Sequence, residues 1–179
     1  MPREQKALWK GSVISIHITS ATEQPMRSVE EVHAVPGRGL EGDRYFLDTG
    51  RFSKYFGPNY EVTFIERETI DALNREYQDL NLTAAESRRN IETWGVPLNR
   101  LVGRAFRIGD VVIYGRLLAE PCLYLAKLTH HNVLAGLIHR GGLRAQFLTE
   151  GIIRVGDPIE EVFGVEVPAV KAHQKVVEH

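Results

Sequence analysis

The sequence has a single cysteine, Cys122, in 179 residues and contains no long apolar run. One thiol permits neither an intramolecular disulfide nor a cysteine-based structural zinc site, and the lack of disulfides fits a reducing compartment. No window approaches the roughly 18 apolar residues of a membrane-spanning helix, and the N-terminus lacks the apolar centre of a signal peptide. These absences predict a soluble, cytoplasmic protein without a membrane partner.

A large excess of charge of either sign is also absent. The formal net charge is −1, whereas a domain held to nucleic acid by electrostatics is normally basic, so we expect no nucleic-acid partner. The basic residues are nevertheless biased, because sixteen of the 22 are arginine. Arginine binds carboxylate and phosphate in a planar, bidentate manner, although a compositional bias of the genome would produce the same excess. Where the arginines fall is therefore more informative than their number.

The signatures of hydrolases and phosphoryl-transfer enzymes are missing. The chain has no G-x-S-x-G sequence, no P-loop and no pair of histidines at metal-ligand spacing. A G-x-G-x-x-G sequence does occur at 37–42, but residues 43–50 lack the helical pattern that must follow a dinucleotide-binding loop. We predict instead a tight loop that directs Asp43 and Arg44 toward a site.

Apolar periodicity predicts many short strands and few helices. Alternation of Ile14, Ile16 and Ile18 with polar residues indicates a half-buried strand. The other predicted strands are 32–35, 61–65, 89–93, 105–108 and 111–114. The predicted helical segments are 66–77, 97–102, 123–128 and 132–139. This order favours a compact, mixed β fold centred on a barrel over a wound βαβ sheet.

The domain organisation follows from the same patterns. We expect an N-terminal extension at 1–11, a single domain at 12–165 and a polar C-terminal tail at 166–179. Residues 45–60 mix aromatic residues with Gly, Pro, Ser and Asn and show no clear period, which predicts a long loop with a functional or mobile role.

Cys122 follows a predicted strand and precedes an apolar segment. A thiol acts as a nucleophile or soft-metal ligand only as the thiolate, which nearby guanidinium groups stabilise. The alternative is an unreactive, buried cysteine that behaves as a small hydrophobic residue. If arginines converge on Cys122, the chemistry at this position is that of sulfur beside an anion.

Two arginine-containing segments are candidates for that convergence. Arg88 and Arg89 are adjacent, so in a strand their side chains point to opposite faces; we favour Arg89, with Asn90, as facing a pocket, and expect Arg88 to lie in solvent. The segment 139–144 places Arg140 and Arg144 around a glycine pair, and exposed backbone amides with arginines form an anion-binding concavity. A C-capping glycine followed by basic residues would explain Arg140 but not Arg144.

Six motifs occur in an order that resembles the MOSC family, named for the C-terminal domain of molybdenum cofactor sulfurase. The motifs are GLEGDR at 39–44, RRNI at 88–91, LVGRxFxIGD at 101–110, EPC at 120–122, HRGGLR at 139–144 and VGDxI at 155–159. Each is weak alone, but the ordered set is specific and covers about 12–162. The chain resembles a stand-alone, bacterial-type member of the family.

The resemblance implies a β-barrel fold and a functional cysteine at the position of Cys122. In the family this cysteine is proposed to carry sulfane sulfur as a persulfide or to bind molybdenum. The family's arginines are thought to hold the phosphate of the pterin cofactor, and by position these are Arg89, Arg140 and Arg144, with Asn90 beside them. Asp43 and Arg44 match the glycine-loop motif. Molybdenum and pyridoxal phosphate binding are associated with the family at large.

Three functions are then open. The favoured one is a sulfur carrier or sulfurtransferase that receives sulfur on Cys122 from a persulfide donor such as a cysteine desulfurase, for molybdenum cofactor chemistry. The second is a reductase module that binds the molybdenum cofactor, a molybdopterin-type ligand, with Cys122 as the metal ligand. The third is a non-catalytic anion- or ligand-binding domain in which Cys122 is merely buried.

Overall fold

A closed β-barrel forms the centre of the molecule. The computed structural model describes residues 5–51, 53 and 61–167. Seven strands of this part pair in the order β11-β7-β8-β9-β5-β6-β1, and β1 pairs with β11 to close the ring. Their bounds are β1 Lys10–Ile18, β5 Val62–Glu66, β6 Ile91–Trp94, β7 Ala105–Ile108, β8 Val111–Leu118, β9 Leu143–Phe147 and β11 Pro158–Glu161. Only the β5–β6 pair among them is parallel. The predicted barrel-centred fold is confirmed.

Strand alternation fills the barrel with apolar side chains. On β9, Leu143, Ala145 and Phe147 belong to the main core, as expected when successive residues face opposite sides of a sheet. The rings of Phe64 and Phe106 meet edge to face with centroids 5.5 Å apart, the preferred geometry of an aromatic pair. The alternate residues, such as Thr63 and Arg144, are therefore left on the outside of the barrel.

A β-bulge changes which isoleucines of β1 are buried. The pairing of β1 with β6 shifts register between Val13 and Ser15, so that Val13, Ile16 and Ile18 are buried while Ile14 is only partly covered. A bulge inserts one extra residue into a strand and reverses the alternation beyond it. The prediction that Ile14 shares a face with Ile16 and Ile18 is wrong for this reason.

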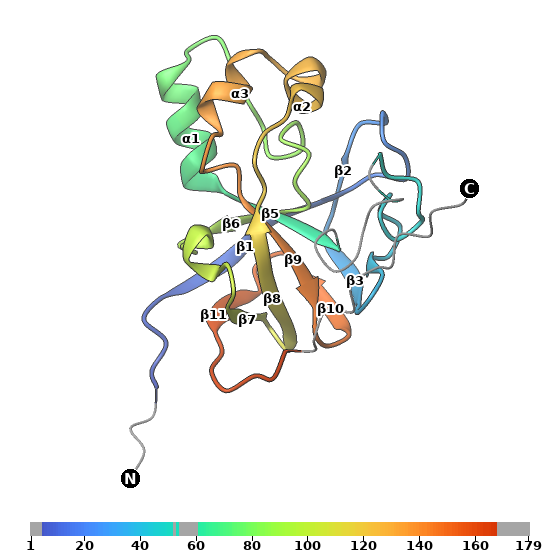
Figure 1. Cartoon of the computed structure of the whole chain (residues 1–179), viewed down its shortest axis with the longest axis vertical. Coiled ribbons are helices and arrows are strands. Elements are labelled where there is room, and N and C mark those ends of the chain that lie inside the picture. Colours follow the sequence, from blue (N-terminus) through green and yellow to red (C-terminus); the bar gives the residue numbers. More distant parts are fainter. Residues whose placement is uncertain (1–4, 52, 54–60, 168–179) are drawn as a thin grey trace, which may run out of the picture.

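Two smaller units flank the barrel (Figure 1). A second sheet has the order β10-β3-β4, with β10 Gly151–Arg154, β3 Glu31–Val35 and β4 Gly39–Leu40, and β2 Arg27–Val29 pairs with the outer half of β1. The helices α1 Arg67–Glu76, α2 Leu123–Leu128 and α3 Asn132–Gly136 gather at one end of the barrel. A 3-10 turn, η3 Leu98–Leu101, packs beside the barrel.

The helices enclose a second apolar core, separate from the barrel interior. Its buried residues come from β5, α1, the segment after α1 and the α2–α3 pair: Ile65, Ile70, Leu73, Leu82, Ala84, Leu125, Val133 and Leu137. Cys122 packs against the edge of this core.

The predicted helical segments at 66–77, 97–102, 123–128 and 132–139 match α1, η3, α2 and α3, although α3 ends at Gly136. Strands β2, β4, β9, β10 and β11 are not among the predicted strands. Most of the predicted tail, 168–179, lies outside the described residues, as do residues 52 and 54–60 of the predicted loop. Among the described helices, none is long and apolar enough to cross a membrane.

Candidate functional site

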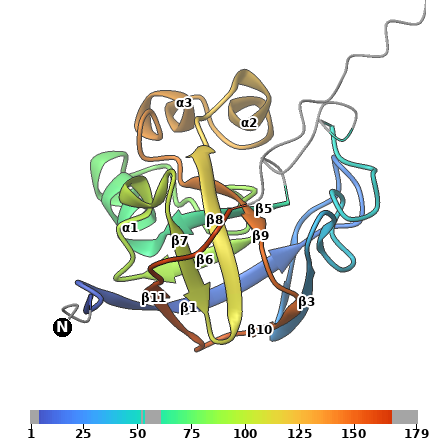
Figure 2. The same ribbon diagram turned by 60° about the horizontal axis from the view of Figure 1, so that its bottom comes forward.

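The α2–α3 segment is an excursion from the β8–β9 hairpin. Its two ends, at Ala119 and at Gly141 and Gly142, lie side by side and form a narrow neck. The chain leaves the sheet after Ala119 and returns at Gly142, and the amide of Ala119 donates a hydrogen bond to the carbonyl of Gly142 at 2.8 Å. Figure 2 shows α2 and α3 above the end of β8. Cys122 lies just beyond this neck, immediately before α2.

The glycine pair allows the two sides of the neck to touch. A Cβ atom at Gly141 would collide with the carbonyl oxygen of Ala119, and one at Gly142 would collide with that of Phe64. Gly142 also has a φ of +103°, a conformation that glycine adopts far more easily than residues with a side chain. The two glycines thus allow this segment to pack closely against the backbone of Ala119 and Phe64.

Arg89 fastens the neck from inside. Its guanidinium donates to the carbonyls of Gly141 at 2.8 Å, Ala119 at 2.7 Å and Ser87 at 3.1 Å. The side chain is almost completely buried. Because Ala119 and Gly141 belong to opposite sides of the excursion, one guanidinium holds both ends of the segment that carries Cys122.

The positive charge of Arg89 is balanced by dipoles and not by a carboxylate among these contacts. Burial lowers the pKa of Arg89 to about 9, and the nearby charges of Arg144 and Arg44 lower it as well, whereas a negative charge on Cys122 raises it. The guanidinium therefore remains protonated at neutral pH, and an anion beside Cys122 is electrostatically favoured.

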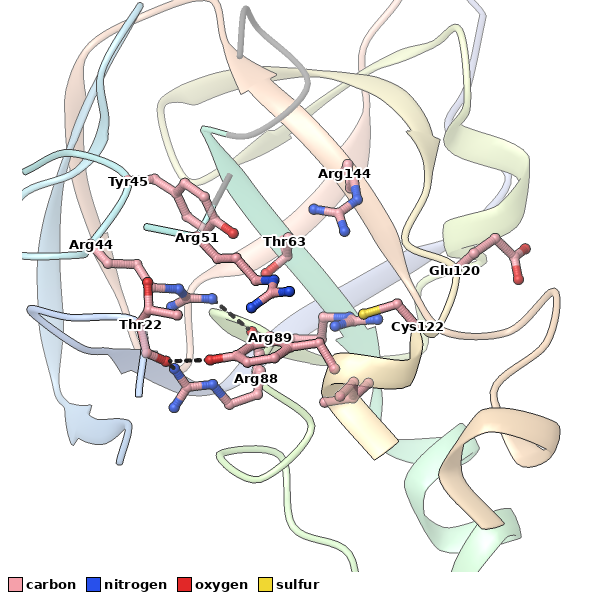
Figure 3. Close-up of a pocket in the computed structure, with 12 residues that line it drawn as sticks. Thr22, Arg44, Tyr45, Arg51, Thr63, Arg88, Arg89, Glu120, Cys122 and Arg144 are labelled. Carbon is pink, nitrogen blue, oxygen red and sulfur yellow. Dashed lines mark hydrogen bonds between the residues drawn. The ribbon is translucent and has the colours of Figure 1, made fainter. Parts of the chain in front are cut away.

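A pocket opens in front of Cys122 and is lined by five arginines (Figure 3). They come from four segments of the chain: Arg44, Arg51, Arg88, Arg89 and Arg144. The remaining lining residues are Thr22, Tyr45, Thr63, Glu120, Cys122, Tyr124 and Leu125. Glu120 is the only carboxylate among these described residues, and it binds the backbone amide and ring of His139 at 3.0 and 3.1 Å. The pocket is therefore strongly positive.

Arg88 builds the wall opposite Cys122. Its φ of +63° turns it out of the strand pattern, and its guanidinium donates to the carbonyls of Thr22 at 2.5 Å and Gln24 at 2.6 Å. The hydroxyl of Tyr124 donates to the same Thr22 carbonyl at 3.2 Å. The prediction that Arg88 lies in solvent is wrong, because β6 begins only at Ile91 and strand alternation does not apply to residues 88 and 89.

The glycine loop brings Arg44 to the pocket with Asp43 behind it. The Asp43 carboxylate is fully buried and accepts hydrogen bonds from the amides of Thr19 and Tyr45 at 3.2 and 3.3 Å. It also pairs with Arg44 at 3.3 Å, and Arg44 donates to the carbonyl of Arg88. Asp43 thus orients Arg44 and does not itself line the pocket.

Comparison with known proteins agrees with this architecture. A model of the MOSC domain matches residues 52–160. The chain belongs to the MOSC family. A search of curated proteins finds no match.

Solved structures share the MOSC fold at low sequence identity. The YuaD protein from Bacillus subtilis is 14% identical, with a TM-score of 0.71 over 86% of this chain and 97% of that one. YiiM from Geobacillus stearothermophilus is 16% identical (TM-score 0.64; 85% and 75% covered), and YiiM from Escherichia coli is 20% identical (0.61; 87% and 72%). These likenesses establish the fold.

Within this MOSC domain, the predicted site residues divide into two groups. Cys122, Arg89, Arg144 and Arg44 meet at the pocket. Asn90 is buried behind it, where its side chain accepts from the amide and hydroxyl of Thr63 and donates to the carbonyl of His17. Asn90 therefore joins β1, β5 and β6.

Arg140 does not line the pocket. Its guanidinium pairs with the carboxylate of Glu76 at 2.6 and 3.1 Å and donates to the carbonyl of Gly136 at 2.6 Å. The side chain thus ties the end of α3 to α1, as the helix-end alternative for Arg140 had suggested.

Several pocket residues were not predicted from the sequence. Thr63 could have been found, because alternation with the buried Val62 and Phe64 places it outside the barrel opposite Arg144. Arg51 and Tyr45 come from the segment without periodicity, and Tyr124 from α2. The Arg51 guanidinium lies 4.3 Å from the centre of the Tyr124 ring, a contact that only the tertiary structure reveals.

Proposed function

We propose that this MOSC protein is a sulfur carrier that holds sulfane sulfur as a persulfide on Cys122. The observation that carries the proposal is the placement of the chain's one thiol at a pocket with five guanidinium groups. Both a thiolate and a persulfide anion are stabilised by such surroundings. Cys122 is partly exposed, so that donor and acceptor can reach it in turn.

The loading step is a sulfur transfer between thiols. The Cys122 thiolate attacks the terminal sulfur of a donor R–S–SH, a new S–S bond forms on Cys122, and the donor's S–S bond breaks as R–S⁻ leaves. The proton stays on the transferred sulfur, and no external oxidant or reductant is needed. Arg89 holds the Cys122 segment in place through the neck, and the arginines around the pocket stabilise the anions formed on either side of the step.

A molybdopterin-type cofactor is the second candidate, and the residue types fit it, although the space of about 50 Å³ at Cys122 would hold only one part of such a molecule. Five guanidiniums are more than one thiolate requires, and they suit a phosphate. Cys122 would supply a thiolate ligand to the metal, while Arg44, Arg144 and Thr63 would bind the anionic part. Such a cofactor would supply two-electron redox chemistry. Pyridoxal phosphate fits less well, because it needs a lysine for its Schiff base and no lysine is among the described residues of the pocket.

The two candidates are separated by analysis of protein purified from its own host. A carrier is expected to show an added mass of one sulfur that is lost on reduction and is absent from Cys122→Ala. Near-stoichiometric molybdenum with release of a fluorescent oxidised pterin, without the sulfur adduct, would transfer the assignment to the cofactor-binding module. A native Cys122 that reacts with thiol reagents only after denaturation would contradict both and favour a binding domain.

A further inference from the structure

A groove on the outer side of α2 adjoins the Cys122 pocket. Its lining residues are Glu23, Arg51, Leu123, Tyr124, Lys127 and Leu128. Arg51 and Tyr124 line both cavities, so the pocket and the groove meet at these two side chains. The pocket in front of the thiol encloses only about 50 Å³, whereas the groove holds about 560 Å³.

The two volumes indicate that one part of a ligand would occupy the pocket and another part the groove. Small-molecule sites typically measure about 300–1,000 Å³, so the space at the thiol admits only the reacting end of a substrate. The groove has the volume for the rest of a small molecule. A ligand that spans both places its sulfur at Cys122 and its body beside α2.

The groove also has a definite charge pattern. Arg51 and Lys127 supply two cations, Glu23 supplies one carboxylate, and Leu123, Tyr124 and Leu128 supply apolar surface. The Arg51 guanidinium lies over the Tyr124 ring, and both residues line the pocket and the groove. The complementary molecule carries two carboxylates and one ammonium group on a short backbone.

We propose that the groove binds a small, peptide-like persulfide with two carboxylates and one ammonium group, and that this molecule is the sulfur donor to Cys122. The inference rests on the proposed sulfur-carrier function and names its substrate class. The donor's terminal sulfur passes to the Cys122 thiolate by the balanced step given above, and the remaining thiolate leaves with the peptide body. Lys127 and Arg51 bind the carboxylates and Glu23 binds the ammonium group.

The test measures how fast Cys122 gains one sulfur, by intact mass, from three small persulfides of different charge. These are glutathione persulfide, which carries two carboxylates and one ammonium group, neutral 2-mercaptoethanol persulfide and cationic cysteamine persulfide. We expect glutathione persulfide to show saturation and to load Cys122 fastest at low concentration. Lys127→Gln should raise its half-saturating concentration about three- to fivefold, the effect of one exposed ionic contact, without changing the maximal rate.

The matched control is Lys10→Gln, which removes an exposed lysine at the start of β1, remote from α2. It should leave all three loading rates unchanged, as should Lys127→Gln for the neutral donor. Equal rates for the three donors, or equal effects of the two lysine substitutions, would overturn the inference. So would loading by a cysteine desulfurase together with no loading by glutathione persulfide. If no donor of any kind loads Cys122, the proposed function itself fails.

Discussion

The barrel interior and the neck of the α2–α3 excursion are built in opposite ways. The barrel is filled with apolar side chains that are sealed from solvent, such as Phe64, Phe106 and Phe147. The neck is held by backbone carbonyls around the buried charge of Arg89. Apolar packing gives stability without directing chemistry, whereas a charge buried among dipoles creates a field at the adjacent thiol. The barrel and the reactive neck are thus stabilised by different means.

The largest effect should come from the barrel. Phe106→Ala removes a fully buried ring that contacts Phe64, and we expect it to lower the free energy of unfolding by about 3–5 kcal/mol. Urea denaturation measures this loss. Phe163→Ala, at an exposed phenylalanine, is the control and should cost less than about 1 kcal/mol. Equal losses in the two variants would contradict the assignment of the barrel as the main core.

The neck should respond differently, with loss of both stability and reactivity. Arg89→Lys keeps the charge but cannot reach three carbonyls at once, so we expect a loss of about 3 kcal/mol. Thiol-reagent kinetics should show slower modification of Cys122 even under conditions where the variant is fully folded. Arg107→Lys, at an exposed position on β7, should change neither property. Unchanged Cys122 kinetics in folded Arg89→Lys would refute the positioning role.

The free energy of unfolding should depend on pH through Glu61, the residue before β5 of the barrel. This buried carboxyl accepts the amides of Gly37 and Phe147, and burial raises its pKa to about 7. Because the pKa of Glu61 is raised in the folded state, the contribution of Glu61 to stability is complete below pH 4.5 and is lost as the pH rises through 7. The loss amounts to at most about 3 kcal/mol.

Glu61→Gln should therefore lose less stability than the wild type between pH 5 and pH 8, as measured by urea denaturation at each pH. Glu30→Gln, at an exposed carboxyl, should follow the wild-type curve. An identical pH dependence of Glu61→Gln and the wild type would show that Glu61 does not titrate in this range.

The smallest effect should come from Arg140. Its ion pair with Glu76 is partly exposed on both sides, and such pairs contribute about 0.2–1 kcal/mol. Arg140→Gln should leave sulfur loading of Cys122 unchanged, because the side chain points away from the pocket. A loss of loading as large as that of Arg144→Gln would instead support the phosphate-binding role that the family resemblance implies for Arg140.

Period-two patterns in the sequence predicted the barrel, whereas the convergence of Arg89 and Arg144 on Cys122 was implied only by the family resemblance and the order of its motifs. Prediction from the sequence failed at Ile14 and Arg88, where a bulge and a left-handed residue interrupt the strand pattern. Arg51 and Tyr124 meet only through tertiary packing, which no local pattern records. The sequence also could not show that Arg140 would bind Glu76, since the two are 64 positions apart.

The central claim is that sulfur is carried on Cys122. The most direct measurement is to incubate the full chain with glutathione persulfide and with a persulfidated cysteine desulfurase, and to map any added sulfur by peptide mass spectrometry. We predict one reducible sulfur per chain, confined to the peptide that contains Cys122 and absent from Cys122→Ala. If neither donor produced an adduct, or if Cys122→Ala carried an equal adduct, the account would be contradicted.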